Sequence, residues 1–102
     1  MRLHRVARLS ELPEGARLVV EVEGEQVLII NDNGKIYAVS NICTHEYAEL
    51  ENGLVVDGTL TCPVHLSRFR LEDGRVLNPP ATKDLKTYPV SVKDGEVFIG
   101  LG

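Results

Sequence analysis

The 102-residue sequence lacks a long apolar run, and no stretch approaches the 18 consecutive apolar residues that a membrane-spanning helix needs. The basic start, residues 1–8, is not followed by the apolar segment of a signal peptide. Basic residues are not in excess either, since 15 acidic side chains stand against 11 basic ones and the net charge is −4. We therefore expect a cytoplasmic protein with no membrane anchor and no nucleic-acid partner, because nucleic-acid binding requires a basic face.

Catalytic motifs are also missing. The sequence has no Ser/His/Asp set and no G-x-G-x-x-G loop, and it has no metal motif beyond the one Cys/His pattern described below. It therefore does not predict an enzyme with its own active site. Internal repeats, low-complexity tracts and linkers are absent. With 43% hydrophobic and 25% charged residues, the composition is that of a globular protein. We expect one domain over residues 1–102, present as a monomer.

Cysteine is scarce, and its placement is the main functional signal. The only two cysteines, Cys43 and Cys62, are followed after two and three positions by His45 and His65, in the pattern C-x-H-x16-C-x2-H. Two inert buried cysteines or a single disulfide would not explain the paired histidines. Two sulfur and two nitrogen ligands suit zinc, or a [2Fe–2S] cluster in which two His replace two Cys. Structural zinc sites usually pair Cys with Cys and His with His, so this mixed spacing favours the cluster.

This pattern resembles the cluster-binding signature of Rieske-type iron–sulfur proteins. Further residues are similar to the family, namely Leu50, Gly53, Ser67, Phe69, Asp73-Gly74, Pro79-Pro80-Ala81 and Tyr88-Pro89-Val90. The resemblance implies one [2Fe–2S] cluster, with Cys43 and Cys62 binding the inner iron and His45 and His65 binding the outer iron. Ligand thiols must stay reduced until the cluster is loaded, which agrees with the cytoplasm.

The resemblance is to one branch of the family. High-potential members carry an extra cysteine in each motif and join them in a disulfide, whereas this sequence has Glu46-Tyr47-Ala48 and Val64 at the matching places. It therefore resembles the soluble ferredoxins that pass single electrons from a ferredoxin reductase to the terminal oxygenase of a ring-hydroxylating dioxygenase. Two alternatives stay open at this point, a small Rieske-like subunit beside the large subunit of a nitrite reductase and a zinc-stabilised interaction module.

Four other residues are expected close to the cluster. In high-potential relatives a serine and a tyrosine at the places of Ser67 and Phe69 donate hydroxyl hydrogen bonds to cluster and cysteine sulfurs, so here only the serine hydroxyl is available. By the same resemblance, Pro79 and Pro80 form a lid that shields one side of the cluster. Leu66 is a departure, because many members have glycine directly after the histidine.

Short alternating segments separated by turn residues predict an all-β chain. We expect strands over residues 3–7, 17–22, 26–31, 35–39, 54–56, 59–61, 68–71, 75–77, 86–92 and 96–99. Hairpin turns are predicted at Asp32-Asn33-Gly34, Asp57-Gly58, Asp73-Gly74 and Asp94-Gly95. The stretch 81–85 is expected to make one helical turn at most. The resemblance implies an antiparallel sandwich or barrel base with an inserted cluster-binding subdomain at about residues 41–80.

Overall fold

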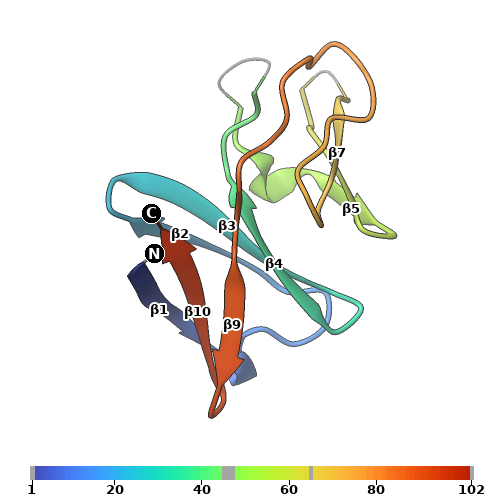
Figure 1. Cartoon of the computed structure of the whole chain (residues 1–102). Helices are drawn as coiled ribbons and strands as arrows, with labels where there is room; N and C mark the ends of the chain where they lie inside the picture. The colour runs from blue at the N-terminus through green and yellow to red at the C-terminus, as the bar shows by residue number, and fades with distance from the viewer. Residues whose placement is uncertain (1, 45–47, 65, 102) are drawn as a thin grey trace.

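The computed structural model describes residues 2–44, 48–64 and 66–101 of the chain (Figure 1). Its elements are, in order, β1 (Arg2–Arg8), the 3-10 turn η1 (Leu9–Glu11), β2 (Arg17–Val22), β3 (Glu25–Asp32), β4 (Lys35–Ser40), the 3-10 turn η2 (Leu50–Asn52), β5 (Leu54–Val56), β6 (Thr59–Thr61), β7 (Arg68–Arg70), β8 (Thr87–Tyr88), β9 (Val90–Lys93) and β10 (Glu96–Leu101). The expected all-β architecture is confirmed. The described part of the chain contains no α-helix, and none of its helical turns has the length and apolarity to cross a membrane.

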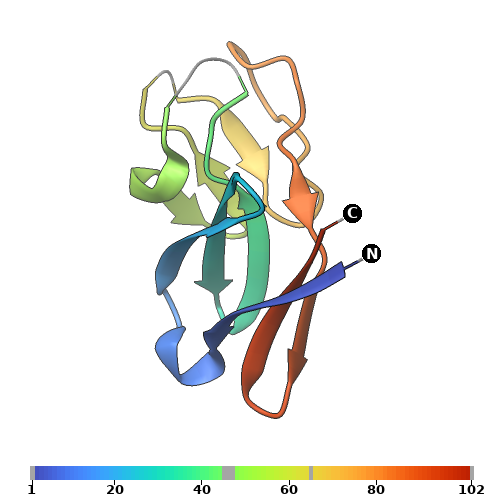
Figure 2. The same cartoon turned by 90° about the vertical axis from the view of Figure 1, so that its left-hand side faces the viewer.

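The strands form antiparallel sheets in three groups within the described chain. The orders are β1-β10-β9, β2-β3-β4-β8 and β5-β6-β7. The first two sheets make the base, in which strands from both ends of the chain lie together, and the third sits beyond the end of β4 (Figures 1 and 2). The base therefore contains the strands before residue 41 and after residue 86.

Strand β3 is buried on both faces, because it separates two hydrophobic cores. Val27 and Ile29 belong to the core that β3 shares with β1, β9 and β10, whereas Leu28 and Ile30 face the core under the small β5-β6-β7 sheet. Successive side chains of a strand point to opposite faces, so an uninterrupted apolar run supplies both cores at once. Strand β3 thus links the base mechanically to the small sheet.

Tight turns with left-handed residues join the predicted hairpins. Asn33 and Gly34 close β3 onto β4, and Asp57 and Gly58 close β5 onto β6, all four with positive φ. Such turns match the twist of the strands they connect, and Asn, Asp and Gly adopt them at least cost. The predicted turns at these places are confirmed.

Two predicted strands are wrong in detail. Residues 75–77 form no strand, because only Val76 makes an isolated bridge to Phe69. Residues 81–85, for which one helical turn at most was expected, make none. The strand predicted over 86–92 is divided at Pro89, which has no N–H to donate to a ladder. At this proline the chain passes from β8, paired with β4, to β9, paired with β10.

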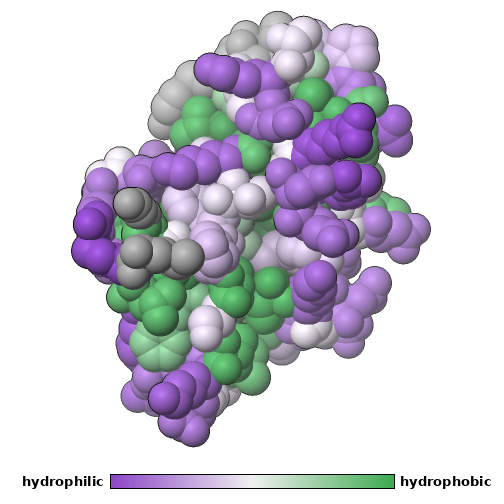
Figure 3. All heavy atoms as spheres, viewed as in Figure 1, coloured by the Kyte–Doolittle hydropathy of each residue, from purple (hydrophilic) through white to green (hydrophobic). Residues whose placement is uncertain are grey.

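The small sheet packs against η2 through a close backbone approach. A Cβ added at Gly53 would lie 2.2 Å from the carbonyl oxygen of Thr61, the residue before Cys62. Only glycine therefore allows η2 and β6 to come so near. In the view of Figure 3, hydrophobic residues gather over the lower part of the molecule near β9 and β10, and hydrophilic residues cover much of the rest.

Candidate metal centre

Two loops at one end of the molecule begin with the two cysteines. Cys43 follows β4 and its N–H donates to the carbonyl of Ala48 at 2.9 Å, while Cys62 follows β6 and its N–H donates to the carbonyl of Ser67 at 2.7 Å. Each bond spans five residues, so the two loops close in the same way. The chain near both cysteines and the chain near residue 80 reach the same end of the molecule in both views (Figures 1 and 2). The topology therefore brings the two cysteines to the same end of the molecule.

Both cysteines are buried in the same hydrophobic core. Cys43 is 4% exposed and Cys62 is 2% exposed, and both pack in the cluster that contains Leu50, Leu60 and Phe69. No disulfide joins the two cysteines. Two buried thiols at the ends of facing loops can supply two thiolate ligands to one iron from the dry side of a site.

The histidine half of the candidate ligand set, His45 and His65, lies outside the described residues, as do Glu46 and Tyr47. Among the described residues no group of three or more His, Cys, Asp or Glu side chains is placed to hold a metal. The assignment of all four ligands thus remains a prediction from the motif, supported by the burial and pairing of the cysteines.

A strap, which we define as residues 79–85, is tied to both ligand loops. Thr44 Oγ1 donates to the carbonyl of Lys83 at 2.7 Å in the first loop, and the N–H of Ala81 donates to Ser67 Oγ at 2.9 Å in the second. The C-terminal end of the strap is fixed by the N–H of Leu85, which donates to the carbonyl of Gly74 at 2.7 Å. These ties hold the two loops in one relative position. The sequence motifs do not predict these hydrogen bonds.

The residues expected near the cluster have different surroundings. Ser67 is 1% exposed and Phe69 is fully buried in β7, whereas Pro79 and Pro80 are exposed on the strap. Because Ser67 Oγ accepts the Ala81 N–H, its hydroxyl proton remains available for a second bond. Leu66 is 64% exposed with φ +62, a left-handed conformation that glycine adopts without strain. The lid and the sulfur hydrogen bond stay predictions.

Charged side chains form hydrogen bonds at η2 and at the turn after β7. The guanidinium of Arg17 in β2 donates to the carbonyl of Glu51 at 2.8 Å and also to that of Gly53, which ties η2 to the base. The Arg70 guanidinium and the Arg75 N–H hold the pKa of the exposed Asp73 carboxyl at about 2, below its ordinary 3.8. Asp73 therefore stays ionised at the turn after β7 in any ordinary buffer.

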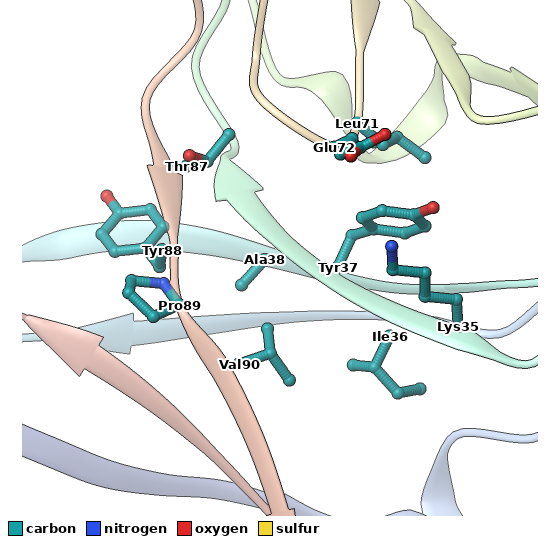
Figure 4. Close-up of a pocket in the computed structure, with 10 residues that line it drawn as sticks. All are labelled: Lys35, Ile36, Tyr37, Ala38, Leu71, Glu72, Thr87, Tyr88, Pro89 and Val90. Carbon is teal, nitrogen blue, oxygen red and sulfur yellow. The ribbon is translucent and has the colours of Figure 1, made fainter.

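A hollow lies at the junction of the base and the small sheet. Its volume is about 450 Å³, and Figure 4 shows side chains of β4, β8 and β9 around it, with Glu72 near Tyr37. The residues that line it are Lys35, Ile36, Tyr37, Ala38, Leu71, Glu72, Thr87, Tyr88, Pro89 and Val90. Neither Cys43 nor Cys62 is among them. Burial and the Glu25 carboxylate, which accepts the Tyr88 hydroxyl at 2.7 Å, raise the pKa of Tyr88.

The sequence profile of the Rieske [2Fe–2S] domain matches residues 2–89. The chain belongs to the Rieske [2Fe–2S] domain family. It is 41% identical over 93 residues to the ferredoxin component of the naphthalene 1,2-dioxygenase system of Pseudomonas aeruginosa, covering 91% of this chain and 89% of the relative. It is 39% identical over 95 residues to the 3-phenylpropionate/cinnamic acid dioxygenase ferredoxin subunit of Photorhabdus laumondii, covering 92% and 90%.

Solved structures agree with this Rieske assignment. The ferredoxin of carbazole 1,9a-dioxygenase from Nocardioides aromaticivorans IC177 superposes with a TM-score of 0.90 at 30% identity, covering 97% of each chain. A chain from the complex of reduced oxygenase and oxidized ferredoxin in carbazole 1,9a-dioxygenase superposes with a TM-score of 0.88 at 28% identity, covering 95% of this chain and 100% of that one. The predicted fold and family are confirmed.

The described residues fit the cofactor of the family. A Rieske domain holds a [2Fe–2S] cluster, and this chain offers two buried cysteines on two loops that close alike and are tied together. The protein is a Rieske ferredoxin, an electron-transfer component of a dioxygenase system and not its catalytic subunit.

Proposed function

We propose that this Rieske ferredoxin accepts single electrons from a ferredoxin reductase and delivers them to the terminal oxygenase of a ring-hydroxylating dioxygenase. The observation that carries the proposal is the full-length similarity to ferredoxin components of naphthalene and 3-phenylpropionate dioxygenase systems. The similarity to a ferredoxin–oxygenase complex of carbazole 1,9a-dioxygenase supports the oxygenase as one partner. The reductase follows from the chemistry, since a carrier that gives electrons away must be reduced again.

We further propose that Cys43 and Cys62 bind one iron and that His45 and His65 bind the other, within a cluster-binding subdomain at about residues 41–80. Bound there, a [2Fe–2S] cluster accepts and releases one electron. The burial of both cysteines keeps water from the sulfur side. The closed loops and the strap hold the ligands rigidly, which lowers the rearrangement needed when charge is gained.

The end of the molecule that holds the ligand loops is the proposed docking surface for both redox partners. Val64 is 49% exposed and Leu66 is 64% exposed, on either side of His65 in the sequence. Exposed apolar side chains beside a redox centre allow a partner to approach closely and exclude water, which shortens the path for the electron. Because both partners need the same short path, they are expected to bind in turn and not together.

The experiment that tests this function is reconstitution from purified components. The purified, air-oxidised ferredoxin is combined with a ferredoxin reductase, NADH and the oxygenase of a naphthalene dioxygenase system, and product formation is measured with and without the ferredoxin. We expect product only when the ferredoxin is present. The reduced protein should also show the low-temperature EPR spectrum of a [2Fe–2S] cluster with mixed Cys and His ligands.

Two other outcomes would contradict the proposal. A colourless protein that contains zinc and no acid-labile sulfide would support a zinc-stabilised interaction module. Stoichiometric co-purification with a large nitrite-reducing subunit would support a role as its small subunit. A cytoplasmic location, which fits the need for reduced ligand thiols, is tested by fractionation of the source cells.

A further inference from the structure

The second ligand loop contains a backbone turn whose strain needs an explanation. Leu66 has φ +62, which is unfavourable for a residue with a side chain. The N–H of Leu66 donates to the carbonyl of Cys62 at 3.1 Å, so the turn belongs to the loop that Cys62 begins. The Leu66 side chain is 64% exposed, so it contributes little packing that could offset the strain. Another contact must stabilise this turn.

Asn78 supplies that contact through both ends of its side-chain amide. Its Nδ2 donates to the carbonyl of Leu66 at 3.2 Å, and its Oδ1 accepts the N–H of Arg68 at 2.6 Å. A backbone bond from the N–H of Leu77 to the carbonyl of Arg68, at 2.8 Å, holds the two segments side by side. The amide of Asn78 thus spans Ser67 and bonds to the residue on each side of it.

The backbone of Asn78 is itself restricted. Asn78 precedes Pro79, and a residue before proline is confined to extended conformations. Pro79 and Pro80 that follow have fixed φ, and the strap beyond them is bonded to Ser67 through Ala81. A side chain on such a stiff segment loses little freedom when it forms two bonds, so the bonds are more effective as restraints.

We propose that Asn78 is a positioning residue that holds the left-handed turn at Leu66, and thereby the backbone of residues 66–68 beside Cys62, in the form that retains the cluster. This inference rests on the proposed function in one respect, that Cys62 and His65 are ligands. We call the two hydrogen bonds of the Asn78 amide the clamp. The clamp is needed because residue 66 carries a side chain, which makes its left-handed conformation unfavourable. Glycine at position 66 would adopt the same φ without help.

The test is a double-mutant cycle on the rate of cluster release. Holoprotein is mixed with an iron chelator, and the loss of visible absorbance is followed for wild type, Asn78→Ala, Leu66→Gly and the double variant. We expect Asn78→Ala to release the cluster about tenfold faster in the wild-type background, which corresponds to about 1.4 kcal/mol. In the Leu66→Gly background the same change is expected to accelerate release by about threefold or less. Asn52→Ala, at an exposed position of η2, is the matched control and should not change the rate.

A second variant keeps the proposal testable if Asn78→Ala does not fold. Asn78→Asp has the same shape and keeps the acceptor for the Arg68 N–H, but it loses the donor to the Leu66 carbonyl. It should accelerate release in the wild-type background and much less in the Leu66→Gly background. Equal acceleration in both backgrounds, or no acceleration in either, would overturn the proposal.

Amide hydrogen exchange separates this inference from the proposed function. The Arg68 N–H bonds to Asn78 Oδ1, so it should exchange faster in Asn78→Ala than in Asn78→Asp. Equal exchange in the two variants would contradict the clamp. A wild-type protein that binds zinc or no metal would overturn the proposed function, while the exchange measurement would still decide whether the clamp exists.

Discussion

Ser67 offers the sharpest test of how this chain tunes its redox centre. Its Oγ is 2.9 Å from the N–H of Ala81 and accepts that bond, and Ser67 is only 1% exposed. The hydroxyl proton therefore needs a second acceptor away from bulk water. With Cys62 at the start of the same loop, a sulfur of the cluster or of a ligand is the acceptor that we predict.

The size of the effect follows from the change in sulfur charge on reduction. A hydrogen bond to a charged group contributes about 1.5–3 kcal/mol, and only the difference between the two redox states, about 1 kcal/mol, alters the potential. For one electron, ~59 mV corresponds to a tenfold change, so Ser67→Ala should lower the midpoint potential by on the order of 40 mV. The substitution also leaves the Ala81 N–H without its acceptor, which should lower the free energy of unfolding by about 1–3 kcal/mol.

Two variants separate these effects by voltammetry and urea unfolding. Ser67→Thr keeps the hydroxyl, so its potential should stay near that of wild type even if the extra methyl group lowers stability in the buried site. Ser91→Ala, at an exposed position of β9, is the control for both measurements. If Ser67→Ala shifts the potential by less than about 10 mV, well below the hydrogen-bond estimate, then Ser67 anchors the strap alone and the reasoning about sulfur is refuted.

Three further outcomes are expected. His45→Ala should abolish the Rieske absorption and EPR spectra, because an iron ligand is lost. Gly74→Ala should lower the free energy of unfolding in urea by about 2–4 kcal/mol, since its φ is +75 and an added Cβ would lie 1.9 Å from the Leu85 carbonyl. Burial and Glu25 raise the pKa of Tyr88, so the folded state favours the neutral phenol. The stability that this preference provides is fully present below the ordinary pKa of 10.0 and is lost as the pH rises further. Tyr88→Phe should therefore lose less stability than wild type between about pH 9 and pH 12.

Local turn chemistry explains why most of the fold could be predicted. The hairpins between β3 and β4 and between β5 and β6 depend on Asn33-Gly34 and Asp57-Gly58, whose positive φ is a property of these residues themselves. The strands they join have β-branched residues and short alternating runs that need no tertiary information. Strand bounds over 17–22, 54–56 and 59–61 consequently agree with the prediction to the residue.

Elements that depend on distant partners were predicted less well. Residues 75–77 do lie beside β7, because the Leu77 N–H donates to the carbonyl of Arg68 at 2.8 Å and Val76 bridges Phe69. The Val76 N–H, however, donates to the Asp84 carboxylate at 3.0 Å and not to a further strand, so the pairing stays an isolated bridge. Residues 86–92 contain one apolar run, but Pro89 sends its two halves to different sheets. The spacing of apolar residues along a strand indicates which of its faces is buried, but it does not indicate which other strand will pair with it.

In the candidate site too, features set by the local sequence could be predicted, and features set by contacts between distant segments could not. The types of ligand could be predicted, because Cys and His at short spacing carry their chemistry wherever the chain places them. The structure brings the two cysteine loops to the same end and buries both cysteines. The groups that hold these loops could not be predicted: Thr44 makes one hydrogen bond and Asn78 makes two, each to a backbone atom at least ten residues away.

Such hydrogen bonds leave no periodic pattern in the sequence, because the sequence of a loop is the same whether a polar side chain in it is solvated or hydrogen-bonded to the backbone. The one local sign was Leu66, which departs from the glycine that the family resemblance implies directly after the histidine. A left-handed turn with an exposed side chain persists only if the surroundings enforce it. The left-handed turn at Leu66 therefore calls for a compensating contact, and we assign that role to the amide of Asn78. Sequence departures at positions that demand glycine are thus the places where supporting side chains should be sought first.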